Sequence, residues 1–204
     1  MQFQYLTTML AFAGAALALP AATTPTKTLG KREATQVLLA IMPSSSSCDG
    51  RGDECRTAVQ AGAYLVQAMI KYGLTEPVEQ AAVLALIAFE SVQMQYKKNL
   101  VNAAAGQGTS NMQMGGFNVQ YANSIPELKA QNPTESTVLD LVIADEYNFG
   151  TGPWFYSTQC QDVKSAAKGD PDAFFDAYMG CVGVNPDEEG RRPYFTSAKN
   201  VFGL

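Results

Sequence analysis

Histidine is missing from this chain of 204 residues. Its absence excludes catalysis by Ser-His-Asp or Cys-His groups, and it also excludes histidine general bases and the usual zinc sites. Acid–base chemistry would therefore have to use carboxylates, tyrosines or lysines. We accordingly expect neither a cofactor nor a bound metal.

Charged residues are also few, at 16% of the chain, and acidic side chains outnumber basic ones to give a formal charge of −5. Nucleic-acid-binding domains are usually basic, so this balance argues against a nucleic-acid partner. No apolar run reaches the length of about 20 residues that a spanning helix needs, which argues against a membrane-embedded protein. We expect a monomer.

The N-terminus carries a targeting pattern. An apolar run rich in small residues ends in Ala16-Leu17-Ala18, which matches the A-x-A cleavage site of a secretory signal. A Thr/Pro-rich stretch follows and ends in the dibasic pair Lys31-Arg32, which resembles a kexin-like processing site. We predict a signal peptide at residues 1–19, a propeptide at 20–32 and a mature extracellular domain at 33–204. A chance dibasic pair in a leader is the alternative for residues 20–32.

The four cysteines gain meaning from secretion, because disulfides form in oxidising compartments. Four cysteines allow three connectivities. We prefer the local pairing of Cys48 with Cys55 and of Cys160 with Cys181, since short separations bring the two ends of a loop together easily. The crossed pairings would tie the N-terminal region to the C-terminal third, and they stay open. Neither pair has the C-x-x-C spacing of a metal site.

The spacing of apolar residues predicts helices along most of the mature chain, and no run alternates with period two for long. One helix is expected over residues 56–72, with Gly73 as its C-cap. Thr75 is expected to cap the next helix, which has Pro77 in its first turn and runs to about Tyr96. Further helices are expected over 121–129, from Pro133, from Asp170 and from Asn185. The predicted fold class is all-α, a single domain with long loops around a central buried helix.

The central helix contains one conspicuous carboxylate. Between Glu79 and Lys97 the only charged residue is Glu90, which shares an apolar helix face with Val83 and Ile87. An unpaired carboxylate on such a face is costly while it stays ionised, so burial should raise the pKa of Glu90. A carboxyl group that stays protonated near neutral pH is what a general acid needs. The alternative is that Glu90 points into water from the helix end.

A Gly-rich loop follows this helix, and aromatic elements follow the loop. The loop reads Gly106-Gln107-Gly108-Thr109-Ser110-Asn111-Met112-Gln113, and Phe117-Asn118-x-x-Tyr121 and Pro153-Trp154-Phe155-Tyr156 come later. A helix ending in Glu-Ser, the loop and the two aromatic elements, in this order, resemble the lysozyme-like superfamily. That superfamily includes lytic transglycosylases, goose-type lysozymes and plant-type chitinases. The resemblance covers roughly residues 56–182 as a pattern, and its individual motifs are short.

The resemblance implies a lysozyme-like helical fold in which Glu90 is the catalytic acid and the Gly-rich loop lines a substrate groove. It also implies that polar side chains position the substrate, while aromatic rings pack on the apolar faces of sugars. The implied substrate-binding residues are Ser91, Gln107, Ser110, Asn111, Gln113, Tyr147, Trp154 and Tyr156. Core packing is the alternative for Trp154 and Tyr156.

The second carboxylate that glycosidases commonly use is not evident near Glu90. No Asp or Glu occurs from Ser91 to Pro126, so the fold would have to bring Asp145 or Glu146 to the site. The resemblance to lytic transglycosylases accommodates a single acid, because groups of the substrate itself take part there. The loop departs from the transglycosylase pattern at Asn111, where those enzymes have glycine.

The sequence therefore predicts a secreted enzyme that cleaves a β-1,4-linked amino-sugar polymer, with Glu90 as general acid. It would be a glycosidase or a lytic transglycosylase, and its partner would be a cell-wall polysaccharide, either peptidoglycan or chitin and chitosan. The alternative is a non-catalytic secreted protein that binds such a glycan, or a host protein, through the same groove. The acidic composition favours cationic chitosan, although the local charge of the groove outweighs the net charge.

Overall fold

The computed structural model describes residues 33–166 and 169–204; the predicted signal peptide and propeptide lie outside the described residues. This part of the chain is helical and contains isolated β-bridges but no β-strand, which confirms the predicted all-α fold class. The α-helices are α1 (Ala34–Ile41), α2 (Ala58–Lys71), α3 (Pro77–Glu90), α4 (Gly115–Asn123), α5 (Pro126–Lys129), α6 (Val138–Val142), α7 (Asp145–Asn148), α8 (Thr151–Gln159), α9 (Val163–Ala166), α10 (Pro171–Val182) and α11 (Arg191–Phe202), with 3-10 turns at Pro43–Ser46 and Gly52–Glu54.

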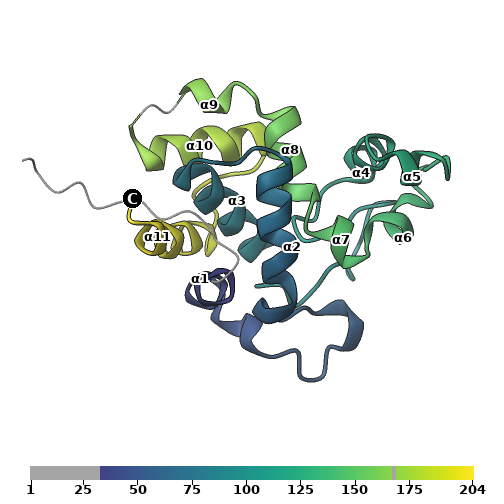
Figure 1. The fold of residues 1–204 in the computed structure, drawn as a ribbon, viewed down its shortest axis with the longest axis horizontal. Coiled ribbons are helices and arrows are strands. Elements are labelled where there is room, and N and C mark those ends of the chain that lie inside the picture. The colour runs from purple at the N-terminus through teal and green to yellow at the C-terminus, as the bar shows by residue number, and fades with distance from the viewer. Residues whose placement is uncertain (1–32, 167–168) are drawn as a thin grey trace, which may run out of the picture.

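Helix α3 is the buried centre of the domain, as the sequence predicts. Every residue from Ala81 to Ala88 is buried, because almost the whole helix surface is apolar and packs against neighbours on all sides. α11 packs along α3, and α1, α8 and α10 also contact it. Figure 1 shows α3 in the middle of the molecule, between α2 and α10.

Both ends of α3 differ from the prediction. The residue that caps the N-terminus is Glu76 rather than Thr75, and the carboxylate of Glu79 accepts hydrogen bonds from both of their backbone N–H groups at 3.0 and 3.1 Å. At the other end the helix stops at Glu90 and does not reach Tyr96. The reason is the backbone of residues 92–94, which have φ angles of 51, 61 and 65°. Left-handed residues cannot continue a right-handed helix.

Other helix boundaries also shift from those expected. The helix expected over 121–129 is two helices, α4 and α5, which are separated just before Pro126. The last helix begins at Arg191 rather than near Asn185. Gly190 has φ of 90°, a left-handed conformation that a right-handed helix cannot include, so the helix starts after it. The Trp154 segment is part of α8.

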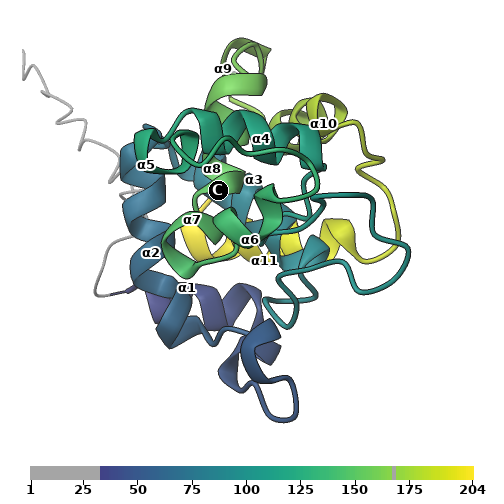
Figure 2. The same cartoon turned by 90° about the vertical axis from the view of Figure 1, so that its right-hand side faces the viewer.

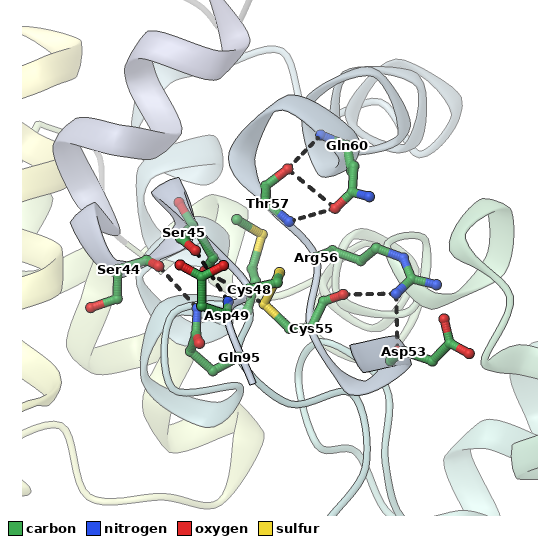
Figure 3. Close-up of a disulfide and its surroundings, with 12 residues drawn as sticks. Ser44, Ser45, Cys48, Asp49, Asp53, Cys55, Arg56, Thr57, Gln60 and Gln95 are labelled. Carbon is green, nitrogen blue, oxygen red and sulfur yellow. Dashed lines mark hydrogen bonds between the residues drawn. A yellow bond between two sulfur atoms is a disulfide. The ribbon is translucent and has the colours of Figure 1, made fainter. Parts of the chain in front are cut away.

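Both predicted disulfides are present, and there is no free cysteine in the described residues. Cys160–Cys181 joins the end of α8 to the end of α10. Cys48–Cys55 closes a short loop before α2, and Figure 3 shows it next to Thr57 and Gln60, which form the capping box of that helix. Gln95 donates a hydrogen bond from its amide to the carbonyl of Ser44 at 2.9 Å, so the same loop is attached to the chain that leaves α3.

The remaining helices lie on two sides of α2 and α8. In Figure 1, α4, α5, α6 and α7 lie together on the right, and α1, α10 and α11 lie on the left; Figure 2 presents the first group to the viewer. The chain that leaves the C-terminal end of α3 connects the centre of the molecule with the first group. Within the described residues, no helix combines the length and apolar character that a membrane crossing requires.

Candidate functional site

A cleft opens at the C-terminal end of α3, and we call it the Glu90 cleft. It consists of two adjoining cavities, of about 520 and about 190 Å³, which share Glu90, Gln107 and Met112 as walls. The wider cavity is completed by Val92, Tyr96, Lys98, Asn99, Leu100 and Val101. The narrower cavity is completed by Leu86, Asn111, Gln113, Met114, Phe117, Phe155, Val182 and Val184.

Glu90 is paired, which corrects the prediction of an isolated carboxylate. Its Oε1 accepts a hydrogen bond from Nη1 of Arg191 at 2.9 Å. The Arg191 side chain is only 2% exposed, its guanidinium lies 4.1 Å from the centre of the Phe89 ring, and its Nη2 donates to Glu188 at 3.0 Å. The partner of Glu90 therefore comes from the start of α11, far away in the sequence.

The pKa of Glu90 is raised, in the predicted direction. The main cause is burial, which removes water from the carboxylate and so disfavours its ionised form. The hydrogen bond and the positive charge of Arg191 lower the pKa, and the negative charge of Glu188 raises it slightly. Burial prevails over the Arg191 pair, so Glu90 presents to the cleft a carboxyl group that keeps its proton to a higher pH than an exposed glutamate.

Ser91 lies behind the cleft rather than in it, against the prediction of substrate binding. Its side chain is fully buried; the hydroxyl donates to the carbonyl of Ile87 at 2.6 Å and accepts from the backbone N–H of Met94 at 2.8 Å. These two bonds connect the last turn of α3 to the left-handed segment 92–94. Ser91 therefore fixes the direction in which the chain leaves Glu90.

The Gly-rich loop supplies three of the predicted residues to the cleft, namely Gln107, Asn111 and Gln113. Gln113 donates from its side-chain amide to Asn118 at 2.7 Å, and Asn111 donates to Gln113 at 3.2 Å. Asn118 in turn donates to the carbonyl of Gly106 at 2.8 Å. The amides of Asn111 and Gln113 therefore stabilise the loop and form the floor of the cleft, while Gln107 is the more accessible of the three.

Glycine is required where this loop meets α4. A Cβ atom on Gly106, which has φ of 70°, would lie 2.5 Å from the carbonyl oxygen of Glu135. A Cβ atom on Gly115 would lie 2.1 Å from the carbonyl oxygen of Ala105. Real Cβ atoms do not approach backbone oxygens so closely, so the loop and the start of α4 can pack in this way only with glycine at both positions.

Ser110 faces away from the cleft, which corrects its predicted role. It is buried, and its hydroxyl donates to the carbonyl of Asn148 at 3.0 Å. Thr151 approaches the same part of the loop, with its Oγ1 2.7 Å from Oδ1 of Asn111. Ser110 and Thr151 therefore attach the loop to the segment that joins α7 to α8.

The predicted aromatic residues do not line the cleft. Trp154 is buried and packs edge-on against Tyr121, with ring centres 5.5 Å apart. Tyr156 is fully buried and donates from its hydroxyl to Glu79 at 2.9 Å. Tyr147 is on α7 and lies 3.4 Å from Glu127 on α5. Trp154 and Tyr156 therefore pack in the core, which was the alternative prediction for these two residues.

The predicted second carboxylate is not beside Glu90. Asp145 accepts a hydrogen bond at 2.7 Å from Nε of Arg56, which lies two residues before the start of α2. Glu146 is next to Tyr147 on α7. Among the described residues, Glu90 is the only Asp or Glu in the walls of the cleft. The chain between Glu90 and α4 contains no acidic residue. The Gly-rich loop contacts α7 through Ser110, which faces away from the cleft, so the acids of α7 do not reach Glu90.

Sequence reasoning missed the cleft residues that carry no motif. Arg191 is the most important, and its only signal was its place in a charged run before a helix. Lys98 and Tyr96 were also missed, although they follow Glu90 within ten residues. The apolar wall made by Leu86, Val182 and other residues could not be separated from core residues by pattern alone.

Comparison with known proteins gives one informative similarity. No family model matches the chain. The chain is similar to a "Bifunctional dioxygenase (DOX)-epoxy alcohol synthase (EAS)" of Fusarium oxysporum (strain Fo5176), with 46% identity over 158 residues. The similar region is 71% of this chain but 12% of that protein, so the chain spans only a small part of the relative's length.

This similarity contradicts the predicted glycosidase or lytic transglycosylase. The relative is named for dioxygenase and epoxy alcohol synthase activities, and neither is the cleavage of a glycan. The relative is named as an enzyme, which agrees with the predicted enzyme only at that general level. The hydrolase assignment is therefore withdrawn.

Oxygen chemistry commonly uses a redox-active metal, and the residues that the structure describes do not offer the usual histidine or thiolate ligands for iron. Histidine is absent, and all four cysteines are in disulfides. Residues 33–166 and 169–204 contain no group of three or more Cys, Asp or Glu that could hold a metal ion. Iron sites with two histidines and a carboxylate, and haem held by a thiolate, both need ligands that this chain lacks.

Proposed function

We propose that this chain is a secreted polysaccharide-binding domain whose Glu90 cleft binds a chain of β-1,4-linked amino sugars. The observation that carries the proposal is the cleft itself: both apolar side chains and hydrogen-bonding groups line its two adjoining cavities, which share Glu90. Such mixed walls suit sugars, whose rings have apolar faces and whose edges carry hydroxyl and amide groups.

Each part of the cleft would contact a different part of the ligand. Asn99 and Gln107 supply amide groups to the wider cavity, and Tyr96 supplies a ring and a hydroxyl. Phe117 and Phe155 pack edge-on with ring centres 4.9 Å apart and form an apolar wall of the narrower cavity. Glu90, protonated to a higher pH than usual, would donate a hydrogen bond to a ligand oxygen from the junction of the two cavities.

A lysozyme-like fold is part of this proposal. It is supported by the buried central helix that ends in Glu90 and by the Gly-rich loop that packs next to that end. Secretion is supported by the two disulfides, since such bonds persist in oxidising compartments. The matched region is only 12% of the relative, so the activities for which that protein is named need not involve it.

A second candidate ligand follows from the relative's name. The walls of the narrower cavity are mostly apolar, with Leu86, Val182 and Val184 among them, and they also include the Glu90 carboxyl group and three side-chain amides. An apolar molecule with an oxygen function at one end, such as an epoxy alcohol, would fit that distribution. Such a molecule would occupy only the narrower cavity, whereas a polysaccharide chain would occupy both.

Titration of the mature protein with the N-acetylglucosamine hexamer, followed by calorimetry, tests the proposal. We expect saturable binding that Gln107→Ala weakens about tenfold, because a wrongly paired polar group costs on the order of 1–3 kcal/mol. Asn123→Ala, on the exposed face of α4, is the matched control and should bind as the unaltered protein does. Absence of hexamer binding together with saturable binding of an epoxy alcohol would replace the first candidate by the second.

A further inference from the structure

Large apolar side chains are exposed around the mouth of the Glu90 cleft. Val92, Leu100, Val101 and Met114 are 52, 61, 72 and 49% exposed, and we call them the apolar rim. Of the seven large apolar residues that are exposed in the described part of the chain, these four all line the cleft. Exposed apolar residues that gather at one place indicate a contact surface, whereas isolated ones need no explanation.

The rim is held in position by the chain around it. Val92 has φ of 51°, which is unfavourable for a β-branched residue, and the bonds of Ser91 on either side of it keep the turn in this shape. Asn99 donates from its amide to Gln107 at 3.2 Å, which attaches the Leu100–Val101 segment to the Gly-rich loop. The rim residues therefore point outward because of their surroundings.

The chain segment that carries the rim residues has few charged side chains. From Ser91 to Pro126 the only charged residues are Lys97 and Lys98, in a chain whose formal charge is −5. Lys98 lies 3.5 Å from Glu54 and is partly neutralised by it. A surface with little charge of its own loses little when it is brought against another surface that is neutral and partly apolar.

We propose that the apolar rim docks the protein onto the surface of an insoluble polysaccharide, where packed chains present the apolar faces of their sugar rings. This proposal rests on the proposed function: one chain end of that surface would enter the cleft while the rim packs on its neighbours. The continuity of the rim with the polar floor of the cleft favours this partner over a membrane. Lys98 is the one basic residue in the walls of the cleft as described, and its pairing with Glu54 leaves little positive charge for holding an anionic bilayer.

Adsorption to insoluble chitin tests the inference, with the Leu100→Ser/Val101→Ser variant compared with Val59→Ser/Ile70→Ser. The second variant is the matched control, because Val59 and Ile70 are 73 and 69% exposed on α2 and do not line the cleft. We expect the rim variant to adsorb at least tenfold more weakly and the control to adsorb like the unaltered protein. The rim variant should also lose more affinity for chitin than for the soluble N-acetylglucosamine hexamer.

Each of the following results would overturn the docking role. Equal losses for chitin and hexamer would mean that Leu100 and Val101 act only as cleft walls. Equal losses in the rim and control variants would mean that adsorption is not specific to the rim. Co-sedimentation of the unaltered protein with phosphatidylglycerol vesicles, abolished in the rim variant, would assign the rim to a lipid surface. Hexamer binding without any adsorption would overturn the docking role alone, whereas absence of both would overturn the proposed function as well.

Discussion

The guanidinium of Arg191 and the carboxylate of Glu90 lie 2.9 Å apart, although 101 positions separate the two residues in the sequence. This contact joins the first residue of α11 to the last residue of α3. Arg191 is buried, so it has little access to water as an alternative partner. The protonation of the one carboxyl group in the cleft therefore depends on how the C-terminal helix is placed.

Removal of the guanidinium should raise the pKa of Glu90 further. In Arg191→Met, burial would still disfavour the ionised carboxylate, while the hydrogen bond and positive charge that oppose burial would be lost. Titration of the Glu90 carboxyl carbon by NMR measures this shift. Arg192→Met is the control, because Arg192 pairs with Asp176 and Asp187 rather than with Glu90. A Glu90 pKa that is the same in the unaltered protein and in Arg191→Met would contradict the assignment.

The raised pKa of Glu90 should also appear in the pH dependence of stability. Between the ordinary value of 4.5 and the raised value, the folded state holds a proton that the unfolded state releases, so this residue makes stability fall as pH rises. Glu90→Gln removes that contribution and should flatten this part of the profile. Urea denaturation from about pH 4 to about pH 7 checks it. Parallel profiles for the two proteins would show that Glu90 does not titrate differently on folding.

The fold class was predictable because it depends on local composition. The run from Ala81 to Ala88 has no polar residue and follows Pro77 in a longer segment, a pattern that favours a helix buried on all sides. The short disulfides were predictable for a similar reason, since close cysteines find each other easily. The end of α3 was not predictable, because a β-branched residue such as Val92 rarely adopts a left-handed conformation. The hydrogen bond from the backbone N–H of Met94 to the Ser91 hydroxyl stabilises that conformation, and it forms only in the folded chain.

The site was predictable only in part. Glu90, Gln107, Asn111 and Gln113 do meet in one cleft, because the loop returns to the helix end that precedes it. Trp154 and Tyr156 read equally well as ligand-binding and as core residues, since a buried aromatic ring and a sugar-binding ring have the same sequence pattern. Arg191 reaches Glu90 through the packing of α11 on α3, which no spacing in the sequence encodes.

Two glycines should respond to alanine in opposite ways. Gly115→Ala puts a Cβ atom 2.1 Å from the carbonyl oxygen of Ala105, and we expect a loss of about 1–3 kcal/mol of unfolding free energy. Gly180→Ala, inside α10, meets nothing within 4 Å and should stabilise by about 0.5–1 kcal/mol, because alanine favours helix more than glycine does. Urea denaturation of both variants checks the pair. Equal effects would mean that the loop is not packed against α4 as described.

The two disulfides should stabilise the domain unequally. Cys160 and Cys181 are 21 positions apart, whereas Cys48 and Cys55 are 7 apart. In the chain-entropy account the longer loop contributes about 3 kcal/mol and the shorter loop about 2 kcal/mol. Thermal unfolding of the variants in which each pair is replaced by alanines should therefore show the larger decrease for the first pair. The reverse order would indicate that the Cys48–Cys55 loop stabilises the domain through its contacts with Gln95 and the start of α2.

The central claim is that the Glu90 cleft is where this protein holds its ligand. The most direct test is an NMR titration of the isotopically labelled domain with the N-acetylglucosamine hexamer, followed at every backbone amide. We predict saturable shifts centred on the residues that line the cleft, namely Leu86, Glu90, Val92, Tyr96, residues 98–101, Gln107, residues 111–114, Phe117, Phe155, Val182 and Val184. Saturable shifts centred on another surface, such as the exposed face of α2, or no shifts at all, would contradict it.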